Sequence, residues 1–598
     1  MVTDQQVQKL VYQMEEGHLG KWIRLTALLS AMVALFVIFI FDPSYAGFYK
    51  GLNHPKAMEQ AQIAREIARG NGFSTKMIRP LAYSQFKSNM GAMPGPRIPD
   101  TYQAPLWPAT LAPFLLVVKH WPDSLIPYRA VSKDRWQLST RDYIYVCDRM
   151  ISAVAMLFFF LSVFVSYFTV RRIFDNYIAI WVVILTLACG VFWQYALSGL
   201  PQMLMLFLFN IAMYGFVRAM EAHNEGAPPF GWLAFTAFFF GLLTLTHGIA
   251  FWPFVGAFCF CVVHFTPRWK TALVMSIVFV GVCTPWLVRN SHVCGNPFGL
   301  SLYSGLEQIR GSEAAIMRSP ILNYAGVSPS IFRRKIQTQL AAQMGNLFQF
   351  LGSMVVAPAF FLSLLHLFKK PAPRNLRWAL LSMWAFSVLG MTLFSLNDEG
   401  SGLAANNLHI LFIPFFAAFG MAFIMVLWTR LEMPVRIVRY AFYTLLFGVC
   451  ALPFFNILTL ATKSPVQWPP YVPPYIAILR DWTQPTEIIT ADMPWAVAWY
   501  ADRKSLWLPM TVQSFLEFCD YERLGGKSGG LYLTPVTGNA GLVSDIVKGD
   551  YKDWAPFILH NVNIANIKDF PLRAVTPMPI DNQCIFYSDR DRWTERGD

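Results

Sequence analysis

The chain reads Asn53-His-Pro-Lys-Ala-Met-Glu59-Gln-Ala-Gln-Ile-Ala-Arg65-Glu-Ile-Ala-Arg-Gly70 just after its first apolar stretch, and this block combines a helical pattern with acids and bases. Four alanines recur at spacings of four and three residues, which places them on one small apolar face of a helix over residues 55–69: Ala57, Ala61, Ala64 and Ala68. Gly70 ends the pattern. A short charged helix of this kind is expected to lie at a membrane surface rather than to cross the membrane.

The composition places this helix in a membrane protein. The 598 residues are 55% hydrophobic and 16% aromatic, with a mean hydropathy of +0.40, which excludes an ordinary soluble protein. A membrane-spanning helix needs roughly 20 apolar residues. About eleven stretches approach that length: 22–41, 143–169, 177–198, 201–218, 231–246, 249–265, 271–288, 347–368, 375–396, 408–428 and 437–461. The sequence therefore predicts a polytopic α-helical membrane protein.

Lysine and arginine set the expected orientation of these spans. They gather before the first span and after the second, sixth, eighth and tenth, so all fall on one side if the N-terminus is cytoplasmic. The loops at 42–142, 289–346 and 397–407 and the tail from about 462 are then external. No small-residue cleavage pattern follows the first span, so we expect an anchor and not a cleaved signal.

The net charge of +13 fits cytoplasmic anchors beside an anionic membrane. No basic patch is interleaved with aromatics, so nucleic-acid binding is not expected. The nine cysteines do not form a disulfide framework. Cys519 and Cys584 fall in the external tail, where a disulfide is permitted, and their pairing stays open because sequence cannot test the geometry.

The first external loop continues beyond the helix. Arg79 follows it, then a Pro- and Gly-rich stretch, and Asp100 opens a second apolar segment that ends near residue 118. We interpret that segment as another interfacial or re-entrant helix. In the second external region, Arg289 and Asn290 end a span at the outer surface, where they could meet a phosphate or serve as the more ordinary interfacial anchor.

The tail divides into a linker and a domain. Residues 462–485 are proline-rich and predict a stiff connection. Strand-like and helix-like segments alternate over 486–598, which predicts a small external α/β domain beside a transmembrane domain of residues 1–461. The tail shows no Gly-rich phosphate loop, metal-ligand spacing or nucleophile motif. A structural or substrate-guiding cap is the favoured interpretation.

In their order along this topology, several motifs resemble the GT-C superfamily of membrane glycosyltransferases, which includes the protein O-mannosyltransferases and the aminoarabinose transferases. The resemblance rests on five runs: Ala61-Gln-Ile-Ala-Arg65-Glu, Ala104-Pro-Leu-Trp-Pro108, Pro285-Trp-Leu-Val-Arg-Asn290, Asn407-Leu-His409 through Pro414, and Asp492 through Pro509. It implies a GT-C-like fold, a sugar donor carried on polyprenyl phosphate, an external acceptor, and a place in the inner membrane with a periplasmic C-terminal domain.

The same resemblance implies roles for particular residues. Glu59 is the candidate catalytic base, and Asp100 positions the acceptor or caps the second helix. Donor phosphate is expected near four residues: Arg79, Arg289, Asn290 and His409. Secondary candidates are Glu66, Arg65 and Gln202. The chain departs from the family where Lys56 and Ala57 replace an Asp-Glu pair, and where Gln202 stands in place of an acid.

These residues predict an inverting sugar transfer in which a base deprotonates the acceptor and lipid phosphate leaves. No cofactor is assigned, and a divalent metal ion stays open. The alternative interpretation of Glu59 is a solvated acid paired with Arg65 or Lys56. The alternative function is a non-catalytic protein that binds lipid-linked sugar, or a transporter. A transporter is disfavoured because no internal repeat is visible.

Overall fold

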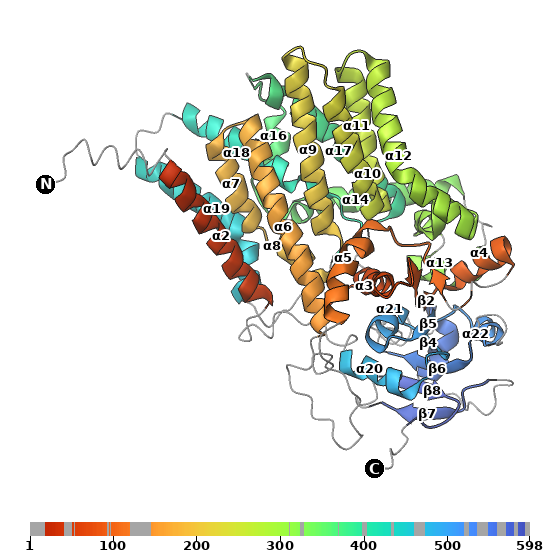
Figure 1. Ribbon diagram of the computed structural model, residues 1–598. Helices are drawn as coiled ribbons and strands as arrows, with labels where there is room; N and C mark the ends of the chain where they lie inside the picture. Colours follow the sequence, from red (N-terminus) through yellow and green to blue (C-terminus); the bar gives the residue numbers. More distant parts are fainter. Residues whose placement is uncertain are drawn as a thin grey trace.

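The computed structural model shows a helical bundle, a layer of short helices at one end of it, and a sheet domain beyond that layer (Figure 1). It describes residues 18–592 apart from these segments: 41–50, 53, 92–94, 96, 120–144, 310, 323–327, 369, 397–402, 432–435, 460–472, 520–525, 535–547, 559–569 and 579–583. Part of the expected linker, 462–472, and the loop residues 397–402 lie outside the described residues.

Six helices of the bundle are long and apolar enough to cross a membrane, or seven if the bent pair α7 (Asn176–Leu187) and α8 (Gly190–Ser198) counts as one span. The six are α6 (Val146–Ile173), α9 (Gln202–Asn224), α12 (Arg268–Cys294), α17 (Pro371–Phe394), α18 (His409–Arg430) and α19 (Arg436–Thr459). Shorter apolar helices join them: α2 (His18–Ile40), α10 (Phe230–Thr246) and α11 (Phe251–His264), with η4 (Gly248–Ala250) before α11. The protein is a multi-pass membrane protein.

One predicted span is wrong as a continuous helix. Residues 347–368 contain only α15 (Leu347–Phe350) and α16 (Ala359–Ser363), separated by turns. Gly352 and Ser353 both have positive φ, and Pro358 follows, so the helical ladder cannot run through. The segment still packs on α18, where the Phe360 and Phe416 rings stack 4.0 Å apart. The count of about eleven transmembrane helices is therefore not confirmed.

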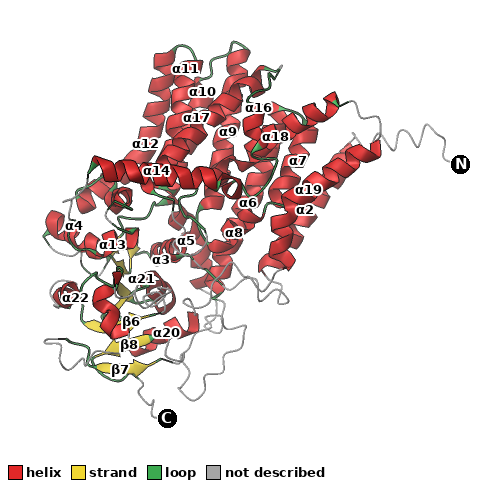
Figure 2. Cartoon of the chain, turned by 180° about the vertical axis from the view of Figure 1, so that it is seen from behind, coloured by secondary structure: helices red, strands yellow, loops and turns green. Residues whose placement is uncertain are grey.

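A layer of short helices lies between the bundle and the sheet domain (Figures 1 and 2). It contains α3 (Pro55–Ala68), α4 (Pro80–Met90), α5 (Leu106–Lys119), α13 (Glu313–Arg318) and α14 (Pro329–Gly345), with the 3-10 helix η5 (Gly299–Leu306). α3 begins with a proline after His54, whose side chain accepts a hydrogen bond from the Lys56 backbone. The predicted helix over 55–69 and the second helix to about 118 are thus present.

α3 is buried on nearly every side, unlike a helix that merely rests on a surface. Its predicted alanine face is fully enclosed at Ala57, Ala61 and Ala64. Gly199, at the turn before α9, has a φ of 79°, and a side chain there would meet Leu52 at 2.4 Å. Only glycine fits this turn. The close contact of Gly199 with Leu52 and Ala57 therefore fixes where α3 packs on the bundle.

The C-terminal domain is built on a six-stranded sheet whose order is β2-β5-β4-β6-β8-β7. Its own strands are β4 (Ile488–Ala491), β5 (Lys504–Trp507), β6 (Ser528–Leu533), β7 (Ala574–Pro577) and β8 (Ile585–Ser588). Its helices are α20 (Pro473–Trp482), α21 (Pro494–Ala496), the single π turn η6 (Val497–Ala501), α22 (Val512–Phe518), η7 (Lys552–Trp554) and α26 (Ala555–Ile558). A sheet-containing C-terminal domain was expected, but α20 lies inside the segment predicted as linker. Cys519 and Cys584 are free thiols.

The first loop of the chain completes this sheet. Its β2 (Met77–Ile78) pairs in parallel with β5, while the adjacent β1 (Ser74–Thr75) pairs with β3 (Ile98–Pro99). The sequence analysis missed β2 because two residues carry no strand signal of their own. The sheet domain is therefore joined by backbone hydrogen bonds to the loop that carries α3.

Two acids, the buried Asp148 and the partly exposed Asp502, strengthen this connection between the sheet domain and the rest of the chain. Asp148 of α6 accepts hydrogen bonds from Trp499 Nε1 and Tyr500 Oη, both at 2.8 Å. Asp502, at the end of η6, contacts Arg65, Arg69 and Lys76 at 3.0, 2.8 and 2.5 Å. Burial alone would raise the pKa of Asp502, but the three cations hold it well below its ordinary value.

We expect Asp502→Asn to loosen the C-terminal domain from α3 by about 2 kcal/mol, because three cations lose their shared anion. The depressed pKa means that this stabilisation is present above the unfolded pKa of about 3.8 and is lost only as pH falls below it through the lower folded pKa. Hydrogen exchange of β5 and α3 at pH 7 measures the effect. Glu517→Gln, an exposed acid on α22, is the matched control. Unchanged protection in Asp502→Asn would contradict the assignment.

Candidate active site

Glu59 lies in the second turn of α3 and is only 3% exposed. Its Oε2 accepts hydrogen bonds from Arg79 Nη2 and Gln103 Nε2, both at 2.7 Å. Its Oε1 lies 2.6 Å from Arg79 Nη2 but has no hydrogen-bond partner of acceptable geometry among the described residues. The alternative interpretation of Glu59 as a solvated acid paired with Arg65 or Lys56 is thus wrong.

Asp100 brings a second carboxylate to the same place. Its Oδ1 accepts backbone hydrogen bonds from Tyr102 at 3.0 Å and Gln103 at 2.7 Å, which closes a turn just before α5. Its Oδ2 lies 3.7 Å from Arg79 Nη1. The Arg79 guanidinium therefore lies between the two acids, and all three side chains are at most 4% exposed.

Burial sets the protonation of this cluster. It raises the pKa of Glu59 to about 7, because the opposing attraction of Arg79 is smaller than the cost of removing the carboxylate from water, and Asp100 raises it further. Burial raises the pKa of Asp100 as well, against Arg79 and the backbone hydrogen bonds. Arg79 stays charged, since the two acids outweigh its own burial. Glu59 thus titrates near neutral pH, as a general base requires.

A second group of charges packs against the cluster, and the sequence analysis missed it. Arg79 stacks over the Tyr102 ring with its Cζ 4.0 Å from the centroid, and the Tyr102 hydroxyl donates to Glu313. Glu313 also pairs with Lys56 Nζ at 3.2 Å. Burial raises the pKa of Glu313, but Lys56 and Tyr102 lower it by more, so this acid is ionised. Only the Ser312 N-cap at the start of α13 marks it in the sequence.

Arg289 holds the loops that carry these acids. From α12 it donates to the backbone carbonyl of Asp100, and to that of Phe73 at 3.1 Å. Its guanidinium lies beside the Phe73 and Trp286 rings, 5.3 and 4.7 Å from their centroids. Asn290 accepts from Arg289 at 2.9 Å and donates to a backbone carbonyl in the following turn. Both residues lie at the rim of the cluster, where they fix backbone.

The remaining predicted residues lie elsewhere. His409 of α18 accepts from Trp384 Nε1 at 3.1 Å and stacks on Phe350. Gln202 donates to the Ala405 carbonyl. Glu66 bonds to Arg69 and Asn71, and Arg65 donates to backbone carbonyls of η6. Glu66 and Arg65 thus belong to the docking of the C-terminal domain.

No family model and no curated protein sequence matches the chain. Solved structures do. The archaeal oligosaccharyltransferase AglB from Archaeoglobus fulgidus, in complex with an inhibitory peptide and a dolichol-phosphate, is 13% identical, with a TM-score of 0.55 over 90% of this chain and 72% of that one. ArnT from Cupriavidus metallidurans bound to undecaprenyl phosphate is 12% identical, with a TM-score of 0.51 over 96% and 99%.

The chain has the GT-C fold. At these identities the likeness establishes the architecture, and the chemistry must be argued from the residues of this chain. The fold-level expectation from the sequence is confirmed, including a multi-pass bundle and a C-terminal domain that contains a sheet. The structures agree over nearly the full length of ArnT, so the C-terminal domain is part of the likeness.

A divalent metal does not fit the acid cluster as built. The oligosaccharyltransferase from Archaeoglobus fulgidus was also solved in complex with Zn and sulfate, at 12% identity and a TM-score of 0.52 over 88% of this chain and 70% of that one. In the described part of this chain, no group of three His, Cys, Asp or Glu side chains could hold a metal ion. Glu59 and Asp100 do approach one another, but the Arg79 guanidinium lies between them.

Arg79→Gln tests this electrostatic arrangement. The variant leaves two buried carboxylates without their cation, so we expect the free energy of unfolding to fall by about 3–5 kcal/mol at pH 8. The loss should shrink toward pH 5, because the pKa of Glu59, raised to about 7, lets this acid protonate there. Chemical denaturation in detergent measures both values, with Lys87→Gln on the exposed face of α4 as control. Equal losses at the two pH values would indicate that Arg79 acts by packing on Tyr102.

Proposed function

We propose that this protein is an integral membrane glycosyltransferase that moves a sugar from a polyprenyl-phosphate donor to an external acceptor with inversion. The GT-C fold supports the reaction class. The observation that carries the proposal is Glu59, a buried carboxylate beside an arginine, with a pKa raised to about 7. A group of this kind, at the junction of a membrane bundle and a soluble domain, is a functional-site candidate on physical grounds.

In the proposed step, Glu59 accepts the proton of the acceptor hydroxyl as that oxygen attacks the anomeric carbon. The new carbon–oxygen bond forms on the face opposite the leaving group, and the bond to the lipid phosphate breaks with its electron pair on the phosphate. The Oε1 atom is the proposed proton acceptor, because Oε2 already accepts two hydrogen bonds. Asp100 is the weaker choice for the base, because its Oδ1 closes the turn at Tyr102 and Gln103.

Arg79 is the proposed partner of the departing phosphate. Its Nη atoms contact Glu59 and Asp100, but its buried Nε–H has no partner among the described residues. A guanidinium has five N–H donors, so it can hold the acids and still bind a phosphate oxygen. We assign Arg289 and Asn290 to positioning the Asp100 turn. His409 stays a phosphate candidate through its unpartnered Nε2.

The proposed function also implies which side of the membrane each end of the bundle faces. The helices α3, α13 and α14 and the C-terminal domain lie at one end of the bundle, while α6 ends and α12 begins at the other (Figure 1). Arg171 and Arg172 are in the last turn of α6, and Arg268 is the first residue of α12. Basic residues favour the cytoplasmic side. We therefore propose that the N-terminus is cytoplasmic and that the acid cluster and the C-terminal domain lie outside, on the periplasmic or extracellular side. The proposed transmembrane domain stays at 1–461. The proposed C-terminal domain begins at α20, before the expected limit of 486, because Trp482 of α20 contacts Phe586 of β8, and β2 completes its sheet.

Glu59→Gln is the decisive variant. We expect turnover of a radiolabelled polyprenyl-phosphate sugar to fall by about 10²–10⁴-fold while donor binding persists, because only the proton acceptor is lost. Wild-type turnover should rise with pH through about 7, as Glu59 ionises. Glu66→Gln, on the same helix but in the docking contact, is the matched control and should keep the wild-type pH profile.

Two results would contradict this assignment. Full turnover in Glu59→Gln would move the base elsewhere. Donor binding without turnover by the wild-type protein, across several sugars and acceptors, would favour the alternative of a non-catalytic protein that binds lipid-linked sugar.

We also propose that turnover needs no divalent metal, because the Arg79 guanidinium supplies the positive charge between Glu59 and Asp100. Treatment with EDTA followed by gel filtration should leave the rate within about twofold of that of the untreated protein. Removal of a catalytic metal ion would lower the rate by much more, because the transition state would lose its electrostatic stabilisation. Magnesium and manganese added back in separate samples serve as controls. A loss of turnover that either ion restores would refute this part of the proposal.

A further inference from the structure

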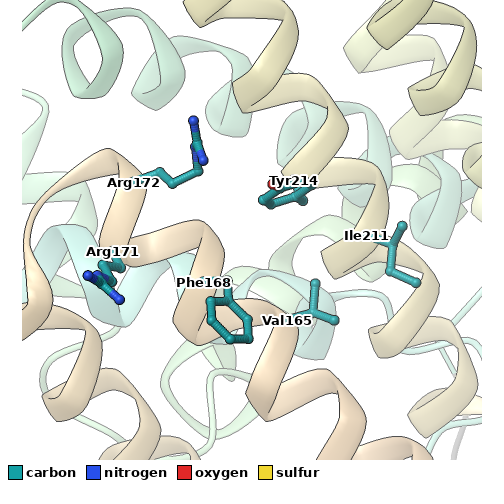
Figure 3. A pocket seen from close by; sticks show the side chains of 6 residues that line it. All are labelled: Val165, Phe168, Arg171, Arg172, Ile211 and Tyr214. Carbon is teal, nitrogen blue, oxygen red and sulfur yellow. The ribbon is translucent and has the colours of Figure 1, made fainter. Parts of the chain in front are cut away.

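A separate pocket opens at the end of the bundle that faces away from the acid cluster. It lies between α6 and α9 and has a volume of about 510 Å³. Three residues of the last turns of α6 and two of α9 face each other across it, with one more arginine at its edge (Figure 3). The lining residues are Val165, Phe168, Arg171, Arg172, Ile211 and Tyr214. None of them belongs to the proposed reaction.

The pocket carries excess positive charge. Glu221 of α9 pairs with Arg172 at 2.8 Å and with Arg218 at 2.9 Å, so one carboxylate serves two guanidinium groups. Arg171 adds a third positive charge to the mouth, with no ion pair to a described residue. Of the two arginines that line the pocket, Arg172 shares Glu221 with Arg218, and the charge of Arg171 has no carboxylate partner among the described residues.

The pocket also has a polar end and an apolar end. Val165 and Phe168 precede the arginines by one to two turns of α6, and Ile211 lies across from them on α9 (Figure 3). The Phe168 side chain is 53% exposed. Because α6 and α9 are both membrane-spanning candidates, the apolar end lies deeper along the spans than the arginines do. A ligand that matches both ends carries a negative headgroup on a hydrocarbon chain.

We propose that this pocket binds an anionic phospholipid, with its phosphate at Arg171 and Arg172 and an acyl chain along Val165, Phe168 and Ile211. Arginine forks suit phosphate oxygens, and basic pockets between transmembrane helices recruit acidic headgroups. The Tyr214 hydroxyl adds a hydrogen-bonding group on the opposite wall. Free inorganic phosphate would leave the apolar end unfilled, so a lipid is the better match. The proposal is independent of the glycosyltransferase function.

Native mass spectrometry of the delipidated full-length protein tests the pocket. Phosphatidylglycerol is titrated as the probe, with phosphatidylcholine, inorganic phosphate and undecaprenyl phosphate in parallel. We expect Arg171→Gln/Arg172→Gln to weaken phosphatidylglycerol binding by about 25-fold, since each basic residue near a lipid surface contributes about fivefold. Arg268→Gln/Lys270→Gln removes two exposed charges from the start of α12, outside the pocket, and should bind as the wild type does. The charge-keeping Arg171→Lys/Arg172→Lys should retain most of the binding.

Four outcomes would overturn the assignment. Equal binding of phosphatidylglycerol and phosphatidylcholine would remove the role of charge, and so would equal losses in the glutamine and lysine variants. Equal losses in the pocket variant and the α12 control would show that general surface charge is responsible. If Arg171→Gln/Arg172→Gln loses the binding of undecaprenyl phosphate but keeps the binding of phosphatidylglycerol, the pocket belongs to the donor lipid.

Discussion

The contact of Arg79 with two buried carboxylates is the constraint on which the rest of the site depends. Burying Glu59 and Asp100 together would be prohibitive without a cation, and removing charges from water costs several kcal/mol even when they are paired. The arrangement persists because Arg79 stacks on Tyr102, which in turn bonds to Glu313. Each buried charge therefore needs the others in place. This fixes the relative positions of α3, the start of α4, the turn before α5, and α13.

The C-terminal domain helps to hold these elements in their relative positions. It takes β2 from the loop between α3 and Arg79 into its own sheet, and Asp502 contacts Arg65 of α3 and Lys76 of that loop. The domain therefore limits how far the Glu59 helix and Arg79 can separate. This arrangement goes beyond the cap expected from the tail's sequence, because the tail shares a sheet with the loop that leads from α3 to Arg79.

Helices that follow from a periodic or apolar stretch of sequence could be predicted. Contacts between segments that are distant in the sequence could not. The alanine spacing predicted α3, and apolar length predicted most of the spans. Positive φ at Gly352 and Ser353 broke the span expected over 347–368, a backbone property that apolar length does not report. Glu59, which the sequence offers as a candidate base, is buried, but its partner Arg79 lies 20 residues away, and Glu313 pairs with Lys56 across 257 residues. Such pairings follow from the packed fold.

The pKa of Glu59 gives the proposed reaction an internal order. The cavity beside Arg79 and Asp100 is only about 10 Å³, room for about one water, so the donor enters only as neighbouring groups move. A phosphate that reaches Arg79 competes with Glu59 for the guanidinium. As that ion pair weakens, the pKa of Glu59 rises above about 7 and the carboxylate becomes the stronger base. Donor binding would thus move the pH range in which Glu59 is ionised to higher values, which links the two substrates through a single arginine.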